Sequence, residues 1–176
     1  GVNSDWLKQL TIKEASKHWN QGVLDRLQKI IQPHYLGVDR VNVRKDYKDK
    51  TVVLAFYPGA YTGVCDTEMC TLQDNMKFFN DLNVVVLGIS VDSPWANGGF
   101  AKQYGLDFDL LSDFDRVVIE KYGVKFEGLG GIDNYTCANR AVFVVKDGVV
   151  RYRWDASPNP GVEPDYDAIK STLEAL

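Results

Sequence analysis

The feature that most constrains the fold is an apolar segment that runs through a Pro/Gly turn into a helical pattern. Thr51 to Tyr57 (TVVLAFY) has the length and composition of a buried strand, and Pro58-Gly59 ends it before a helix predicted over Thr62 to Asn80. The pattern then repeats. Asn83 to Val91 predicts a second strand, and Pro94 at a first helical position opens a helix to Tyr104. This strand-helix-strand-helix order predicts parallel strands joined by crossover helices.

The second half of the chain predicts shorter elements. They are a strand over Asp109 to Ser112, a helix over Asp115 to Tyr122, a Gly-rich loop over Val124 to Asn139, a hairpin of Arg140 to Val145 with Val149 to Trp154, and a helix over Pro164 to Leu176. Crossover strands followed by a hairpin predict an α/β, thioredoxin-like fold, in which helices flank a central mixed sheet.

The N-terminal region predicts an extension to this fold. The residues from Thr11 to Ile31 carry a capping-box pattern and apolar positions at helical spacing, and Pro33 ends them. We therefore expect residues 1–32 to form an atypical N-terminal helical extension and residues 33–176 a single domain. The helix is expected to pack on the domain or on another subunit, and a regulatory partner helix is the alternative. Val41 to Val43 is a candidate short strand.

Composition excludes several classes of partner and location. The net charge of the 176 residues is −4 and the chain has no Lys/Arg cluster, which argues against a nucleic-acid or anionic membrane surface. No segment approaches about 18 consecutive apolar residues, so no membrane span is predicted. The three cysteines are too few for a disulfide scaffold. We expect a soluble cytoplasmic protein with a small substrate.

Cys65 falls in the first turn of the helix that follows the first strand. A helix N-terminus offers free N–H groups and a partial positive charge, which favour the thiolate, the nucleophilic form of cysteine. Thr62 can place its hydroxyl in the same pocket, Pro58 removes one N–H and shields the pocket from water, and Glu68 can orient an arginine. Because a buried cysteine is also a common small core residue, Cys65 alone leaves both interpretations open.

Arg140 is the candidate cation for this thiolate. It is a lone arginine at the head of the apolar strand Ala141 to Val145, where a buried charge needs a partner. The alternative is a strand-end residue that faces solvent.

These residues carry a resemblance to the peroxiredoxins. The string PGAYTGVC fits the PxxxTxxC pattern of that family, with Pro58, Thr62 and Cys65 at the motif positions and Arg140, in NRAVFVV, at the position of the family's arginine. Further segments are similar to archaeal and bacterial members of the bacterioferritin-comigratory, or Q-type, branch, and we interpret the chain as archaeal-like. They are LGISVDSPW (Leu87 to Trp95), LLSD (Leu110 to Asp113) and EPDYD (Glu163 to Asp167).

The resemblance implies a thioredoxin-fold peroxidase without a cofactor. It would reduce hydrogen peroxide and organic hydroperoxides with electrons from a thioredoxin- or glutaredoxin-like dithiol. In chemical terms, the Cys65 thiolate attacks the peroxide, Thr62 and Arg140 hydrogen-bond it, and Cys65 becomes a sulfenic acid. A second thiol must trap this acid before more peroxide oxidises it.

Two cysteines compete for the resolving role. The Cys-x4-Cys spacing of the Q-type branch implies Cys70. Five residues along an intact helix separate the Cα atoms by about 8.6 Å, beyond the limit of about 7 Å for a disulfide, so the helix would have to unwind locally. Cys137 lies in the predicted loop three residues before Arg140 and either resolves in place of Cys70 or takes no part.

Other functions have weaker support. A metal site would have to use the cysteines with His18 and His34, which lack the usual spacing, and the absence of Cys-x2-Cys argues against a general disulfide reductase. A chaperone-like module with the N-terminal helix as its surface and a thiol-disulfide redox sensor built on Cys65 and Cys70 remain as alternatives. Monomer and homodimer are both left open.

Overall fold

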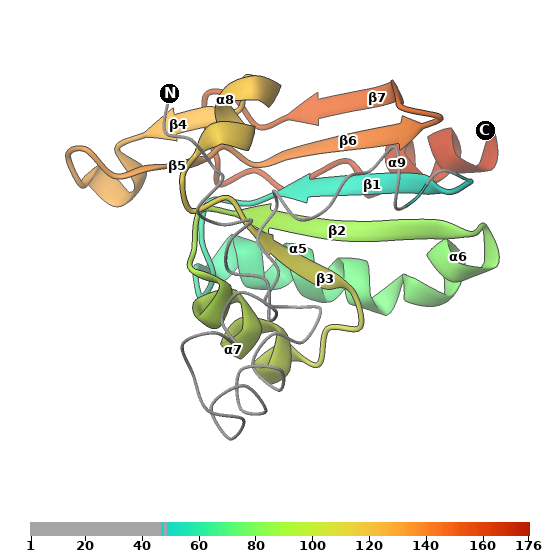
Figure 1. Cartoon of the computed structure of the whole chain (residues 1–176), viewed down its shortest axis with the longest axis horizontal. Helices are drawn as coiled ribbons and strands as arrows, with labels where there is room; N and C mark the ends of the chain where they lie inside the picture. The colour runs from blue at the N-terminus through green and yellow to red at the C-terminus, as the bar shows by residue number, and fades with distance from the viewer. Residues whose placement is uncertain (1–46, 48) are drawn as a thin grey trace, which may run out of the picture.

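The computed structural model describes Tyr47 and residues 49–176, in which a central five-stranded sheet has helices on both faces (Figure 1). The predicted N-terminal helix and the candidate strand Val41 to Val43 lie outside the described residues, so both stay predictions. The thioredoxin-like α/β fold with a central mixed sheet is confirmed.

The sheet has five strands in the order β3-β2-β1-β6-β7. These are β1 (Thr51–Phe56), β2 (Val84–Ser90), β3 (Asp109–Ser112), β6 (Ala141–Lys146) and β7 (Val149–Asp155). The first three run parallel, whereas β6 and β7 are antiparallel to their neighbours. Phe56 at the end of β1 therefore lies opposite Ala141 at the start of β6. This register brings the residue before β6, Arg140, to the edge where the chain leaves β1.

The helices divide between the two faces of the sheet. One face carries α5 (Gly63–Asp74), α6 (Met76–Asp81), α7 (Pro94–Tyr104) and α9 (Tyr166–Glu174). The other carries α8 (Val117–Tyr122) and a small two-stranded sheet of β4 (Lys125–Glu127) and β5 (Thr136–Ala138), joined through the 3₁₀ turn η3 (Leu129–Gly131). Successive residues of β1 point to opposite faces, so Val53 and Ala55 join the first core and Val52 and Leu54 the second.

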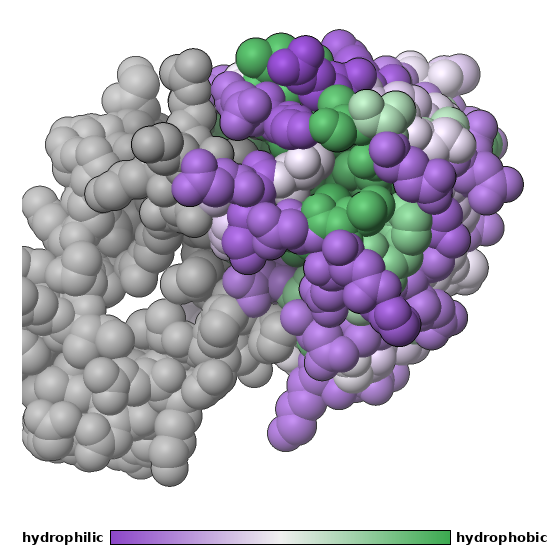
Figure 2. All heavy atoms as spheres, turned by 90° about the vertical axis from the view of Figure 1, so that its right-hand side faces the viewer, coloured by the Kyte–Doolittle hydropathy of each residue, from purple (hydrophilic) through white to green (hydrophobic). Residues whose placement is uncertain are grey.

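The two ends of the sheet have different surroundings. Figure 2 views the end where α6 and the end of α9 lie, and there a patch of hydrophobic side chains is surrounded by hydrophilic ones. The carboxyl ends of β1 and β2 lie at the opposite end, where α5 and α7 begin (Figure 1). Ligand sites of parallel sheets form at such an edge.

Two predictions of secondary structure are wrong in detail. The helix expected over Thr62 to Asn80 breaks at Asn75, whose amide side chain donates to the Thr71 carbonyl at 2.7 Å and competes with the helical bonds. The Gly-rich loop expected over Val124 to Asn139 contains β4 and β5, each of only three residues, too short to give a periodic signal.

The helix α7 is continuous although Asn97-Gly98-Gly99 lies inside it. Its Asn97 is fully buried and accepts hydrogen bonds from Tyr57 Oη at 2.7 Å and Ser90 Oγ at 3.1 Å, while its amide donates to the Leu111 carbonyl at 3.4 Å. This one side chain ties α7 to β2, to β3 and to the residue that follows β1. The polar residue in the helix is explained by these bonds.

We predict that Asn97→Ala lowers the free energy of unfolding by about 2–4 kcal/mol, because it leaves buried hydroxyl and carbonyl groups without their partner. Urea unfolding measures this change. Lys102→Ala, at an exposed position of the same helix, is the control and should change the free energy by less than about 0.5 kcal/mol. Equal effects of the two substitutions would contradict the anchoring role of Asn97.

Candidate active site

Cys65 is the third residue of α5, and its side chain is fully buried. Thr62 is the N-cap residue in an extended conformation, and its carbonyl accepts the Cys65 N–H at 2.8 Å. The Thr62 hydroxyl does not cap the helix; it donates to the Gly59 carbonyl at 2.7 Å. The first N–H groups of α5 therefore keep their partial positive charge beside the thiol, and the exposed Thr62 oxygen is left as an acceptor.

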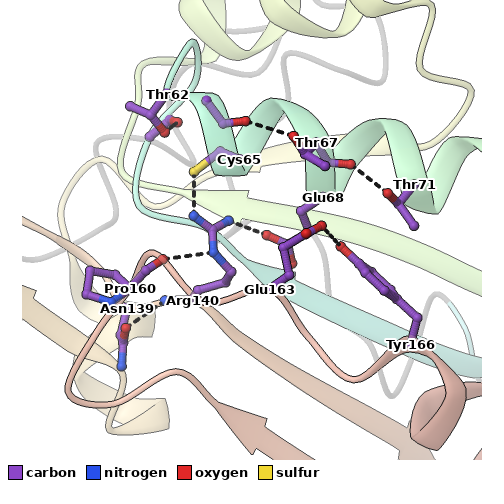
Figure 3. Close-up of polar contacts among 12 residues, drawn as sticks. Thr62, Cys65, Thr67, Glu68, Thr71, Asn139, Arg140, Pro160, Glu163 and Tyr166 are labelled. Atoms are coloured by element: carbon purple, nitrogen blue, oxygen red, sulfur yellow. Dashed lines mark hydrogen bonds and ion pairs between the residues drawn. The ribbon is translucent and has the colours of Figure 1, made fainter.

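The Arg140 guanidinium contacts three groups, two on α5 and one in the segment after β7 (Figure 3). Its Nη2 donates to Cys65 Sγ at 3.1 Å, its Nη1 to Glu68 Oε2 at 2.5 Å, and its Nε to the Pro160 carbonyl at 2.9 Å. The Arg140 side chain is 2% exposed, so the alternative of a solvent-facing strand end is wrong. The structure brings Arg140, Cys65 and Glu68 together, as the sequence predicted.

Glu68 is completely buried, one helical turn after Cys65. Its Oε2 is paired with Arg140, but its Oε1 has no hydrogen-bond partner among the described residues. Burial raises the pKa of Glu68 to about 7; the cation of Arg140 opposes this shift and the nearby Glu163 carboxylate adds to it. Glu68 therefore holds the arginine in place while adding an anion that titrates near neutral pH.

The turn between β1 and α5 is held by a hydrogen bond to Asp92, which lies just after the end of β2. Pro58 and Gly59 are buried, and the Ala60 N–H donates to Asp92 Oδ2 at 2.9 Å. The same carboxylate oxygen accepts from Ser90 Oγ at 2.8 Å. Asp92, which the sequence did not single out, thus fixes the turn that contains the buried Pro58 and leads to Thr62.

The segment between β7 and α9 also lies beside the site, which sequence reasoning missed. Pro160 supplies a carbonyl to Arg140, and Glu163 accepts a hydrogen bond from Tyr166 Oη at 2.9 Å next to Glu68 (Figure 3). Burial, followed by the Glu68 charge, raises the pKa of Tyr166 above its usual value. The EPDYD stretch was the only sequence signal for this segment. The Pro160 carbonyl that contacts Arg140 lies about twenty residues further along the chain.

The other two cysteines are free thiols in different surroundings. Cys70 is half-buried on the unbroken α5, so the Cα atoms of Cys65 and Cys70 lie about 8.6 Å apart, too far for a disulfide without unwinding. Cys137 is fully buried on β5, where it pairs with Phe126 of β4. Burial, with smaller effects of Cys65 and Asp92, raises the pKa of the Cys137 thiol to about 12. Cys137 is thus held as an inert thiol in the folded state.

Among the residues that the structure describes, no three His, Cys, Asp or Glu side chains group as a metal site. His18 and His34 lie outside that part. Within the same residues, no helix combines the length and apolar character needed to cross a membrane.

We predict that Glu68→Gln gains stability relative to the native chain as pH rises. The pKa of Glu68 lies higher in the folded state than its ordinary value of 4.5, so its contribution to stability is fully present below pH 4.5 and is lost as the pH rises through about 7. Gln keeps the shape without this titration. The difference in free energy of unfolding between the two proteins should therefore grow by roughly 3 kcal/mol from pH 4.5 to pH 8.

Urea unfolding at several pH values measures this difference. Glu174→Gln, at an exposed position near the end of α9, is the matched control and should show no such trend. A pH-independent difference for Glu68→Gln would show that burial does not control the ionisation of Glu68.

Comparison with known proteins agrees with this geometry. The model of the AhpC/TSA family matches residues 36–153. Peroxiredoxin Bcp of Escherichia coli (strain K12) is 36% identical over 118 residues, which are 66% of this chain and 75% of that protein. Alkyl hydroperoxide reductase E of Mycobacterium bovis is 40% identical over 130 residues, which cover 72% and 80% of the two chains.

Solved structures show the same relationship. Peroxidoxin BcpB from Mycobacterium tuberculosis aligns with a TM-score of 0.61 at 31% identity, over 72% of this chain and 79% of that one. A PrxQ variant from Xylella fastidiosa aligns with a TM-score of 0.64 at 25% identity, over 74% and 79%. These relatives are bacterial, so the archaeal-like character stays a prediction.

The chain belongs to the AhpC/TSA family, among the Bcp/PrxQ peroxiredoxins, and is a thiol-dependent peroxidase.

Proposed function

We propose that this peroxidase reduces hydrogen peroxide and organic hydroperoxides at Cys65 and resolves the oxidised form with Cys70. The observation that supports the first step is the hydrogen bond from Arg140 Nη2 to Cys65 Sγ at the N-terminus of α5. A cation and a helix N-terminus both favour the thiolate that must attack the peroxide. In the folded site, the reactive sulfur and its activating groups are already in contact.

The first step transfers one oxygen atom to sulfur. The Cys65 thiolate attacks the terminal oxygen of ROOH, the S–O bond forms as the O–O bond breaks, and RO⁻ leaves and takes a proton from water. Arg140 donates to the oxygen on which negative charge develops, and the Thr62 hydroxyl, whose proton is directed to Gly59, accepts from the peroxide O–H. Pro58 keeps water from the buried side of the sulfur.

The second step forms a disulfide between Cys65 and Cys70. The S–S bond forms as the S–OH bond breaks, and the hydroxide leaves as water with the proton of the Cys70 thiol. Because α5 is unbroken in the structure, its first turns must unwind for the two sulfurs to meet. Cys137 is the weaker candidate, since it is fully buried and paired within the β4–β5 sheet.

A dithiol protein of the thioredoxin or glutaredoxin class completes the cycle in this proposal. Reduction of the disulfide by thiol exchange restores both thiols. The rat relative named thioredoxin-dependent peroxide reductase, 33% identical over 137 residues, supports the thioredoxin class. That alignment spans 68% of this chain and 50% of the relative. The same proposal places the protein in a reducing compartment such as the cytoplasm, where its three free cysteines persist between cycles.

We predict that Arg140→Lys slows the reaction of reduced enzyme with hydrogen peroxide by about a hundredfold, because one ammonium cannot replace the three donors that reach Cys65, Glu68 and Pro160. Stopped-flow oxidation of Cys65 measures this rate, and oxidation by a small disulfide at equal concentration is measured beside it. Arg151→Lys, at an exposed position of β7, is the control. Faster reaction with the disulfide than with peroxide would favour the redox-sensor alternative.

We also predict distinct outcomes for the three cysteine variants. Cys65→Ser should abolish peroxide reduction, Cys70→Ser should complete one turnover and then stall as sulfenic acid, and Cys137→Ser should cycle at the native rate with a dithiol donor. Peptide mapping by mass spectrometry after one equivalent of peroxide identifies the disulfide. Normal cycling by Cys70→Ser would contradict the resolving assignment, and stalling by Cys137→Ser would transfer that role to Cys137.

A further inference from the structure

A second polar cluster lies on α5, on the side that faces α7. We call Asp66, Cys70, Asp74 and Tyr104 the α5–α7 cluster. Tyr104 Oη, from α7, donates to Asp66 Oδ2 at 2.7 Å and so joins the two helices. The second oxygen of that carboxylate, Asp66 Oδ1, is buried and has no hydrogen-bond partner among the described residues. The catalytic steps above use Cys70 but assign nothing to the aspartates or the tyrosine.

The spacing along α5 places Cys70 between two carboxylates. Asp66 lies four residues before Cys70 and Asp74 four residues after it, and residues four apart are neighbours on one face of a helix. Cys70 and Asp66 are half-buried, so the Asp66 charge is only partly screened by water, whereas Asp74 is exposed and its charge is screened more strongly. Negative charges at this distance favour the neutral thiol over the thiolate.

The direction of the pKa shifts of Cys70 and Tyr104 agrees with this placement. Burial raises the pKa of the Cys70 thiol, and Asp74 and Asp66 raise it further. The hydrogen bond to Asp66 is the largest of the effects that raise the pKa of Tyr104, which also senses Cys70 and Tyr61. The titratable groups facing one another here are thus the two aspartates and Cys70 from α5, Tyr104 from α7 and Tyr61 from the turn before α5.

Aromatic packing reinforces the contact between α7 and the start of α5. The Tyr61 ring lies 5.3 Å from the Phe100 ring, and the Phe100 ring lies 5.1 Å from the Tyr104 ring, both edge-on. Tyr61 has a φ of 63°, an unfavourable backbone conformation for a side chain of this size. Gly99 leaves room for Tyr61, because a Cβ there would lie 3.3 Å from its hydroxyl. α7 therefore holds a strained turn and the first turns of α5 together.

We propose that Asp66 is a positioning residue for the resolving step: through Tyr104 it holds the first turns of α5 on α7, and with Asp74 it keeps Cys70 a neutral thiol until α5 unwinds. This inference rests on the proposed role of Cys70. When the turns unwind, Asp66 leaves Tyr104 and the fixed four-residue spacing around Cys70 is lost. The freed thiol then ionises more readily, and its thiolate forms the S–S bond as the S–OH bond of Cys65 breaks and hydroxide takes up the released proton.

The charge effect is tested without any peroxide. In a Cys65→Ser, Cys137→Ser background, Cys70 is the only thiol, and its alkylation by iodoacetamide is followed as a function of pH. Asp66→Asn and Asp74→Asn should each move the profile to lower pH and raise the rate at pH 7 by about three- to tenfold. Asp66→Glu, which keeps the charge, should retain the original profile, as should Asp167→Asn at an exposed position of α9. Unchanged profiles in both asparagine variants would overturn the charge effect.

The tether is tested by Tyr104→Phe, which removes the hydrogen bond without changing any charge. It should raise the alkylation rate of Cys70 by the same few-fold factor at every pH, and in a chain with all three cysteines it should speed disulfide formation after one equivalent of peroxide about two- to fivefold. An unchanged rate of disulfide formation in Tyr104→Phe and in Asp66→Asn would overturn the tether. If Cys70→Ser cycles normally, the resolving role fails instead, while the alkylation profiles still show whether the carboxylates control this thiol.

Discussion

The contacts of the Arg140 guanidinium determine how the rest of the site is arranged. One side chain donates to sulfur on the first turn of α5, to a carboxylate on its second turn and to a backbone carbonyl after β7. It reaches them because β6 runs antiparallel to β1, so that its first residue lies beside the end of the strand that leads into α5. A planar group with donors in fixed directions can satisfy three such acceptors at once, and this requires both α5 and the segment after β7 to be in place.

The charges around Arg140 connect the oxidation of Cys65 with the contacts that hold the first turn of α5. A buried guanidinium needs an anion, and here Glu68 supplies it; Arg140 also donates to Cys65 Sγ, which carries a second negative charge in the thiolate form that attacks the peroxide in the proposed mechanism. The pKa of Glu68 is raised to about 7 because burial disfavours the charged carboxylate, and the nearby Arg140 cation only partly offsets this effect. Oxidation to sulfenic acid removes the charge from sulfur, and the charge-assisted part of its bond to Arg140 is lost. The first turn of α5 then depends more on the Asp66–Tyr104 hydrogen bond and the packing against α7.

The fold class was predicted from local signals, whereas the contact of Arg140 with Cys65 was predicted from a lone charge together with the resemblance to the peroxiredoxin pattern. The apolar run from Thr51 and the Pro94 helix start are periodic or positional patterns, and Arg140 was identified since a charge beside an apolar strand needs a partner. The break at Asn75 was missed because it depends on one side-chain hydrogen bond. The contribution of Pro160 was missed because it supplies only a backbone carbonyl, which carries no residue-specific signal, from a distant segment.

The proposed cycle makes two opposing demands on the N-terminus of α5, and the contacts of α5 with Arg140 and α7 affect both. In the proposed mechanism, an intact N-terminus activates Cys65, whereas a disulfide with Cys70 requires that N-terminus to open. Resolution by Cys137 would instead require a fully buried thiol to leave its strand pairing with Phe126 and the second core of the sheet. Opening the first turns of α5 breaks the hydrogen bond of Cys65 with Arg140 and that of Asp66 with Tyr104 on α7, and it removes Cys65 and Met69 from the first core. If Cys70 resolves Cys65 as proposed, the strength of the hydrogen bonds to Arg140 and to Tyr104 affects how long the oxidised sulfur stays in the folded site, where a second peroxide can reach it before Cys70 does.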